Sequence, residues 1–201
     1  MVEHNPCREV RRNKEKPRNR LPTDEEIKTF MEVAKRRGAG SELIGIMGRF
    51  TALTGRRRAE FLTLMHSQVS DEGITLEFAK DKADEAKRKG FIPWTPALRQ
   101  VFEDAKAIKR PGKAPPASVY VFPTRRGQAY TEQGFKAMWS KIMTDWLAED
   151  RSRQRFTFHD LRAYYVTVMV DRNENPETHA NPATTRKIYD RRRVVNIKAT
   201  A

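Results

Sequence analysis

Four short segments of this sequence carry side chains whose types and spacing could do chemistry. Residues 54–60 (TGRRRAE) place three arginines ahead of a glutamate, and residues 79–89 are rich in lysine. Residues 159–162 (HDLR) and the stretch from His179 to Tyr189 complete the set. Arginine and lysine bind oxyanions, histidine and lysine exchange protons, and a tyrosine hydroxyl can act as a nucleophile. Each segment alone has an ordinary explanation, such as a surface ion pair or a solvated turn, but together they indicate one anion-handling site.

The charge of the chain supports an anionic partner. Its 201 residues carry a formal net charge of +14, and residues 1–20 contribute only seven Lys or Arg against three Glu. The excess charge therefore belongs to the body of the chain, which indicates binding to a polyanion, with DNA or RNA ahead of an anionic membrane surface. A basic surface that serves only solubility is the ordinary alternative.

Several classes of protein are excluded by composition. No apolar run approaches the about 18 residues of a transmembrane helix, and the N-terminus lacks the apolar stretch of a secretory signal. The single cysteine, Cys7, excludes an internal disulfide and a zinc site built from cysteines. We therefore expect an intracellular, reducing compartment.

Helix signals dominate the first third of the chain. A capping box that begins at Thr23 predicts a helix that stops at Gly38. Ser41 is a candidate cap for a second helix, and Gly55 stands where that helix should end. A short third helix is expected over residues 60–65.

The spacing of apolar residues then changes from helical to alternating, which indicates a small sheet. Residues 73–78 alternate apolar and polar side chains, as a strand does, and residues 90–94 are a candidate antiparallel partner across the lysine-rich stretch. Apolar residues at helical spacing predict further helices over residues 96–108, 131–147, 159–171 and 183–189. Four large side chains of the 131–147 segment are expected to be core rather than base-stacking platforms: Phe135, Met138, Trp139 and Trp146. The predicted fold class is α+β, mostly α-helical with a small antiparallel sheet.

In this order, the four segments resemble the motifs of the tyrosine recombinases, the phage integrase family. Residues 54–65 resemble the first-arginine motif of the family, with Arg57 as the arginine and Glu60 as the acidic residue that supports the site. Residues 156–162 resemble its His-x-x-Arg motif, which assigns His159 and Arg162. The resemblance covers roughly residues 23–195.

The remaining assignments also follow from this resemblance. Residues 184–190 resemble the tyrosine motif, so Tyr189 is the candidate nucleophile, and His179 matches the second histidine. Lys80 best fits the lysine of the sheet turn, with Lys82 as the alternative. The resemblance implies a tyrosine recombinase catalytic domain over residues 23–189. Residues 1–22 would be a basic linker to an N-terminal DNA-binding domain that is absent here, and residues 190–201 a basic tail.

The resemblance implies site-specific recombination of DNA, for integration or excision. Tyrosine would attack a phosphodiester to give a 3′-phosphotyrosine and a free 5′-hydroxyl, and a second strand would then attack the phosphotyrosine. Arg57 and Arg162 would hold the phosphate oxygens, His159 would act as base, and Lys80 would protonate the leaving oxygen. His179 would hydrogen-bond the phosphate. No metal and no cofactor are required.

The same residues are compatible with other functions. A type IB topoisomerase shares the tyrosine, the arginines and the lysine, and a nonenzymatic DNA-binding module would carry the motifs without activity. An RNA-binding domain lacks a supporting motif. The expected partners are double-stranded DNA and further copies of the chain, in a tetramer on DNA, and no membrane. The expected location is the cytoplasm of a bacterial cell, with the nucleoid.

Overall fold

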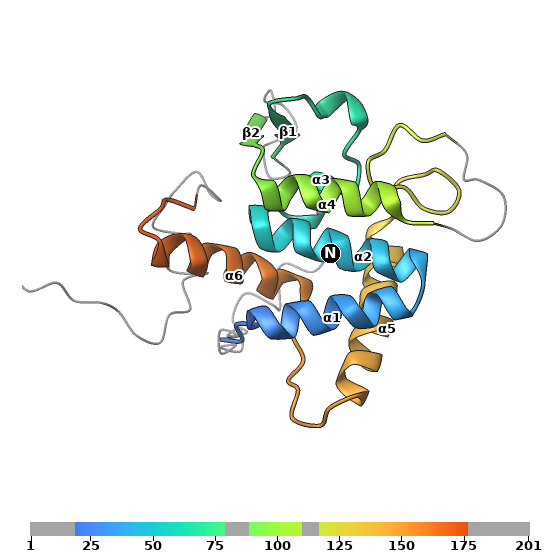
Figure 1. Cartoon of the computed structure of the whole chain (residues 1–201), viewed down its shortest axis with the longest axis vertical. Coiled ribbons are helices and arrows are strands. Elements are labelled where there is room, and N and C mark those ends of the chain that lie inside the picture. The colour runs from blue at the N-terminus through green and yellow to red at the C-terminus, as the bar shows by residue number, and fades with distance from the viewer. Residues whose placement is uncertain (1–18, 79–88, 110–116, 177–201) are drawn as a thin grey trace, which may run out of the picture.

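The computed structural model describes residues 19–78, 89–109 and 117–176, and within them the chain is mostly helical (Figure 1). The elements in chain order are α1 (Asp24–Arg36), α2 (Ala39–Thr54), α3 (Arg58–Phe61), the 3₁₀ turn η1 (His66–Gln68), β1 (Gly73–Glu77), β2 (Lys89–Pro93), α4 (Pro96–Ala107), α5 (Glu132–Ala148) and α6 (Phe158–Asp171). The predicted fold class, mostly α-helical with a small antiparallel sheet, is confirmed. Within the described ranges, no helix is long and apolar enough to cross a bilayer.

Helix α2 is the centre of the fold. It packs against α1, α4, α5 and α6, and Figure 1 shows it running between α1 and α4. Its sequence is apolar on nearly every side, and residues such as Leu43, Ile44, Met47 and Phe50 are fully buried. A helix that is hydrophobic on all sides must be covered on all sides, so the other helices pack around α2.

Threonine caps begin α1, α4, α5 and α6, whereas α2 and α3 begin without a side-chain cap. Thr23 Oγ1 accepts from the Glu26 N–H at 3.2 Å while Glu26 accepts from the Thr23 N–H at 2.9 Å, so the predicted capping box of α1 is confirmed. The prediction that Ser41 caps the second helix is wrong, because α2 already begins at Ala39. Gly38 precedes it with a φ of 101°, a conformation that glycine adopts without strain, and the chain therefore turns from α1 into α2 without a longer loop.

The third helix lies earlier than predicted, at Arg58–Phe61 instead of residues 60–65. Beyond it the chain leaves the helical path, because the backbone around Met65 pairs with a distant segment around Tyr120. Val121 N–H donates to the Leu64 carbonyl at 2.8 Å on one side of this bridge. This pairing across the fold outweighs the local preference for a longer helix.

The two strands pair as the alternation predicted. β1 and β2 are antiparallel, with Ile74 opposite Ile92 and Glu77 opposite Lys89. Ile74 and Leu76 are buried and anchor the sheet to the helices. The strands therefore present their Glu77 and Lys89 ends to the connection 79–88, which lies outside the described residues.

An aromatic core runs beneath the helices. Phe30 of α1 contacts Trp139, Trp146 and Phe156, and a second group joins Phe50, Phe61, Phe102 and Phe122. Both groups reach Phe158, the first residue of α6, whose ring centroid lies 5.2 Å from that of Trp139 and 6.0 Å from that of Phe61. The expectation that Phe135, Trp139 and Trp146 are core is confirmed, and Met138 is partly buried against them.

Candidate active site

Arg57 directly precedes α3, and the side chain of Glu60 holds it in place. The Glu60 carboxylate accepts from the Arg57 backbone N–H at 2.9 Å and from Arg57 Nη1 at 3.1 Å. The Glu60 side chain is 1% exposed and that of Arg57 18% exposed. One buried carboxylate therefore fixes both the main chain and the side chain of Arg57, and its guanidinium remains accessible at the surface.

The first turn of α6 positions the second group of predicted residues. Thr157 caps the helix, and Asp160 closes a capping box by accepting from the Thr157 N–H at 2.7 Å and from its hydroxyl at 2.8 Å. Within this rigid turn His159 is exposed, whereas Arg162 is 1% exposed. Arg162 Nη1 donates to the Gly55 carbonyl and so ties α6 to the end of α2.

Gly55 makes this junction possible. It ends α2 in the left-handed conformation with a φ of 62°, and its N–H donates to the Thr51 carbonyl at 2.8 Å. A Cβ atom at this position would lie 2.3 Å from Cδ1 of Tyr165 on α6. Only glycine allows the two helices to approach closely enough for Arg162 to reach the backbone of α2.

Three of the predicted site residues meet in one pocket. Arg57, His159 and Arg162 all line a cavity of about 330 Å³, although Arg57 lies about 100 positions before the other two in the sequence. The other described residues that line it are Thr51, Arg56, Arg58, Ala59, Glu132 and Phe158. Two guanidinium groups and an exposed imidazole around one opening suit an oxyanion with a proton to transfer.

The other predicted residues lie outside the described residues. They are Lys80, its alternative Lys82, His179 and Tyr189. The chain on either side of the lysines is described, and Phe78 packs there beneath the Arg56 guanidinium, which lies 5.3 Å from the ring centroid. The end of β1 is thereby placed beside the arginine motif, but the roles of these four residues remain predictions.

Sequence reasoning missed several residues of the pocket wall. Arg56 and Arg58 flank Arg57 in the motif, and Thr51 lies one helical turn before Gly55 with its hydroxyl buried and without a hydrogen-bond partner among the described residues. The flanking arginines were visible in the motif itself. Glu132 carries no such signal, because it comes from the start of α5, far away in the sequence.

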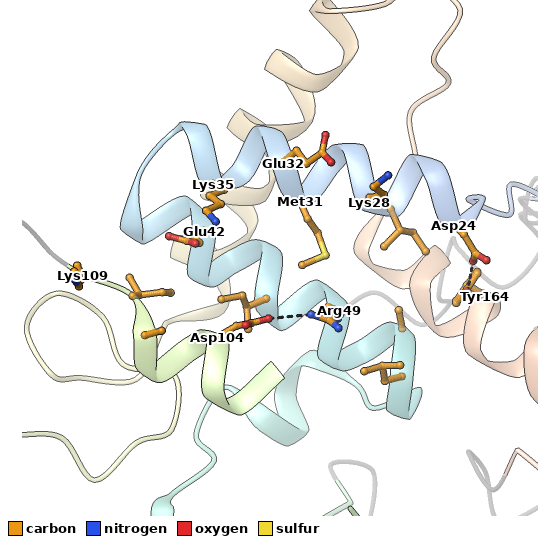
Figure 2. A pocket seen from close by; sticks show the side chains of 16 residues that line it. Asp24, Lys28, Met31, Glu32, Lys35, Glu42, Arg49, Asp104, Lys109 and Tyr164 are labelled. Carbon is orange, nitrogen blue, oxygen red and sulfur yellow. Dashed lines mark hydrogen bonds and ion pairs between the residues drawn. The ribbon is translucent and has the colours of Figure 1, made fainter. Parts of the chain in front are cut away.

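A second, larger pocket of about 800 Å³ lies on another part of the molecule, lined by α1, α2 and α4 (Figure 2). At its edge the Tyr164 hydroxyl donates to the Asp24 carboxylate, and burial together with this hydrogen bond raises the pKa of Tyr164 well above its usual value. This tyrosine therefore keeps its proton and joins α6 to α1, in accord with a structural role. Among the described residues, no three His, Cys, Asp or Glu side chains are grouped so that they could hold a metal ion.

Comparison with known families agrees with this geometry. The model of the phage integrase family matches residues 20–194. The chain belongs to the phage integrase family. A comparison with curated protein sequences gave no match.

Solved structures of two integrases share the fold. The transposon Tn1549 integrase in complex with circular intermediate DNA matches with a TM-score of 0.66 and 15% identity over 88% of this chain and 62% of its own. A lambda integrase dimer bound to a COC′ core site matches with a TM-score of 0.69 and 15% identity over 95% of this chain and 66% of its own. The chain thus spans less than two thirds of these integrases. The resemblance to the phage integrase family and its catalytic-domain fold is confirmed.

Proposed function

We propose that this chain is the catalytic domain of a site-specific DNA recombinase that cuts and rejoins DNA through a 3′-phosphotyrosine. The observation that carries the proposal is the convergence of Arg57, His159 and Arg162 on one open pocket in a chain of the phage integrase family. The substrate is double-stranded DNA, and the product is integrated or excised DNA.

The pocket supports phosphoryl transfer because its charge lies where the transition state needs it. As a tyrosine oxygen approaches the phosphorus, negative charge grows on the non-bridging oxygens, and guanidinium groups hold such oxygens in a fork without losing their own charge. Arg57 and Arg162 perform this role, and clamps of this kind contribute several kcal/mol to transition-state stabilisation. Glu60 keeps Arg57 in place and does not face the phosphate.

The remaining steps are assigned to His159 and to residues that lie outside the described ranges. The Tyr189 hydroxyl attacks the phosphorus and passes its proton to His159, while the bond to the 5′-oxygen breaks and Lys80 protonates that oxygen. His179 hydrogen-bonds the phosphate. The 5′-hydroxyl of a second strand then gives its proton to Lys80 and attacks the phosphotyrosine, and His159 returns its proton to the released Tyr189 oxygen. The bond energy is conserved and no ATP is consumed.

We propose a tetramer on DNA as the working assembly. Lambda integrase has been solved as a tetramer bound to a Holliday junction, and it matches this chain with a TM-score of 0.67. In this scheme residues 23–189 form the catalytic domain, residues 1–22 join it to a DNA-binding domain, and residues 190–201 form a basic tail. The protein acts on the nucleoid in the cytoplasm of a bacterial cell.

Covalent trapping tests the proposal directly. The protein is mixed at low salt with supercoiled plasmid and nicked duplexes, quenched with SDS, and analysed by gel and mass spectrometry beside Tyr189→Phe. We expect a protein–DNA adduct on Tyr189 that the variant lacks, together with strand exchange between two duplexes. Plasmid relaxation without exchange would instead indicate a type IB topoisomerase. Salt-sensitive binding without any adduct would indicate a nonenzymatic DNA-binding module.

A further inference from the structure

Arg58 occupies the pocket beside Arg57, and the proposed mechanism gives it no role. It is the first residue of α3 and lines the same cavity as Arg57, His159 and Arg162. Its guanidinium lies 5.8 Å from the ring centroid of Phe135, a contact that holds the side chain in place. A third arginine fixed at a phosphate site requires an explanation of its own.

The partner of Arg58 is a carboxylate from a different element. Arg58 Nη2 donates to Glu132 Oε2 at 2.8 Å, and Glu132 is the first residue of α5. The Arg58 side chain is 21% exposed and that of Glu132 is 52% exposed. Nε of Arg58 is buried and has no hydrogen-bond partner among the described residues, so the contact of Nη2 with Glu132 is the hydrogen bond that an incoming oxyanion would replace. Arg58 is therefore only partly satisfied by the protein itself.

The charges around the pocket make Glu132 an unusual member of its wall. Among the described residues that line the pocket, four are arginines, and Glu132 is the one carboxylate. A phosphate that enters the opening is attracted by the arginines and repelled by Glu132. Because Glu132 is about half exposed, water competes for its carboxylate and the ion pair contributes little free energy, so a phosphate can displace the carboxylate at low cost.

We propose that Arg58 is a third phosphate-binding arginine of the site, and that Glu132 occupies it until DNA displaces the carboxylate. The inference rests on the proposed function, because it takes DNA as the ligand. The carboxylate stands in for a phosphate oxygen in the free protein and keeps the guanidinium ordered. DNA binding then exchanges one oxyanion for another on Arg58, and Glu132 turns out toward solvent.

The test is salt-dependent binding of the full chain to a duplex of mixed sequence, followed by fluorescence anisotropy. Glu132→Gln should tighten binding by about twofold to fivefold, because the carboxylate that competes for Arg58, and that also lies 3.8 Å from Lys136 Nζ, is lost. Arg58→Ala should weaken binding and reduce the slope of log K against log salt by about one unit, as expected when one phosphate contact is removed. In the Arg58→Ala background, Glu132→Gln should have no further effect beyond that of net charge.

A matched control separates this exchange from a change in overall charge. Arg49 and Asp104 form a comparable exposed pair at 3.0 Å at the second pocket (Figure 2), so Asp104→Asn makes the same change in net charge away from the site. An effect of Asp104→Asn as large as that of Glu132→Gln would overturn the inference. So would wild-type affinity and salt slope in Arg58→Ala, when thermal unfolding shows that the variant is folded. If the wild-type chain binds no DNA, the inference and the proposed function both fail, whereas unchanged variants alongside a trapped Tyr189 adduct refute the inference only.

Discussion

At the scale of single residues, the two predicted clamp arginines are held in different ways. Arg57 is bound by a buried carboxylate and remains partly exposed, whereas Arg162 is almost fully buried and donates to a backbone carbonyl. Both anchors fix the guanidinium before any ligand arrives, and such preorganisation makes electrostatic catalysis effective. Glu60 is accordingly a positioning residue that acts through Arg57.

We predict that Glu60→Gln slows adduct formation by about tenfold, the lower end of the effect known for residues that orient metal ligands through a hydrogen bond. The amide can still accept from the Arg57 backbone N–H, but it attracts the guanidinium less strongly. The rate should therefore fall while DNA affinity and unfolding temperature change little. Single-turnover cleavage at saturating protein, compared with a DNA titration, separates the two effects. A variant that loses affinity but cleaves at the wild-type rate when saturated would contradict the positioning role.

At the scale of elements, the site depends on the contact between the end of α2 and the start of α6. Gly55 closes α2, accepts from Arg162, and leaves no room for a Cβ beside Tyr165. The capping box of Thr157 and Asp160 sets the direction in which α6 leaves this contact. The geometry of the pocket is therefore fixed where two helices meet.

We predict that Gly55→Ala destabilises the fold by about 3 kcal/mol, of which about 1 arises from the left-handed backbone and the rest from the clash with Tyr165. The control is the same Gly55→Ala change made in a Tyr165→Ala background, because the backbone conformation is then unchanged and the ring atoms that the added Cβ would meet are absent. Urea unfolding in both backgrounds measures the difference. An equal loss in the two backgrounds would show that backbone strain, and not the close approach to α6, explains the glycine.

At the scale of the whole molecule, the first and last described helices are joined directly. The Tyr164 hydroxyl of α6 donates to the Asp24 carboxylate at the start of α1, as Figure 2 shows. Burial, followed by this hydrogen bond, raises the pKa of Tyr164 above the ordinary value of about 10. The folded protein thus holds this proton more tightly than the unfolded chain does.

We predict that this contact stabilises the fold below pH about 10 and is lost progressively above it, because the unfolded chain then releases the tyrosine proton first. The difference in unfolding free energy between wild type and Tyr164→Phe should be about 1 kcal/mol at pH 8 and should shrink as the pH rises past 10. Urea unfolding between pH 8 and pH 10.5 checks this. A difference that stays constant over that range would contradict the raised pKa of Tyr164 in the folded protein.

Local signals in the sequence predicted the parts of the fold that local chemistry decides. The caps at Thr23 and Thr131 start helices where expected, and the alternation of β1 predicts its buried face. The third helix was misplaced because the backbone at Met65 pairs with a segment more than fifty residues away. No local pattern reports such a pairing.

In the candidate site, too, local motifs predict some features and long-range packing decides the others. Arg57, His159 and Arg162 could be named from their motifs, since the spacing within each motif reflects one helix start. The depth at which Arg162 is buried and the pairing of Arg58 with Glu132 could not be predicted, because each joins elements whose relative position only the packed core determines.

The aromatic core has an optical consequence. Trp139 lies 4.5 Å from the ring centroid of Phe30 and 5.2 Å from that of Phe158, and its indole N–H is buried without a hydrogen-bond partner among the described residues. An indole kept from water emits at short wavelength, and this one touches the residue that begins α6. In a variant that keeps only Trp139 of the three tryptophans, the emission maximum therefore reports, without a label, whether the helix that carries His159 and Arg162 is packed in place.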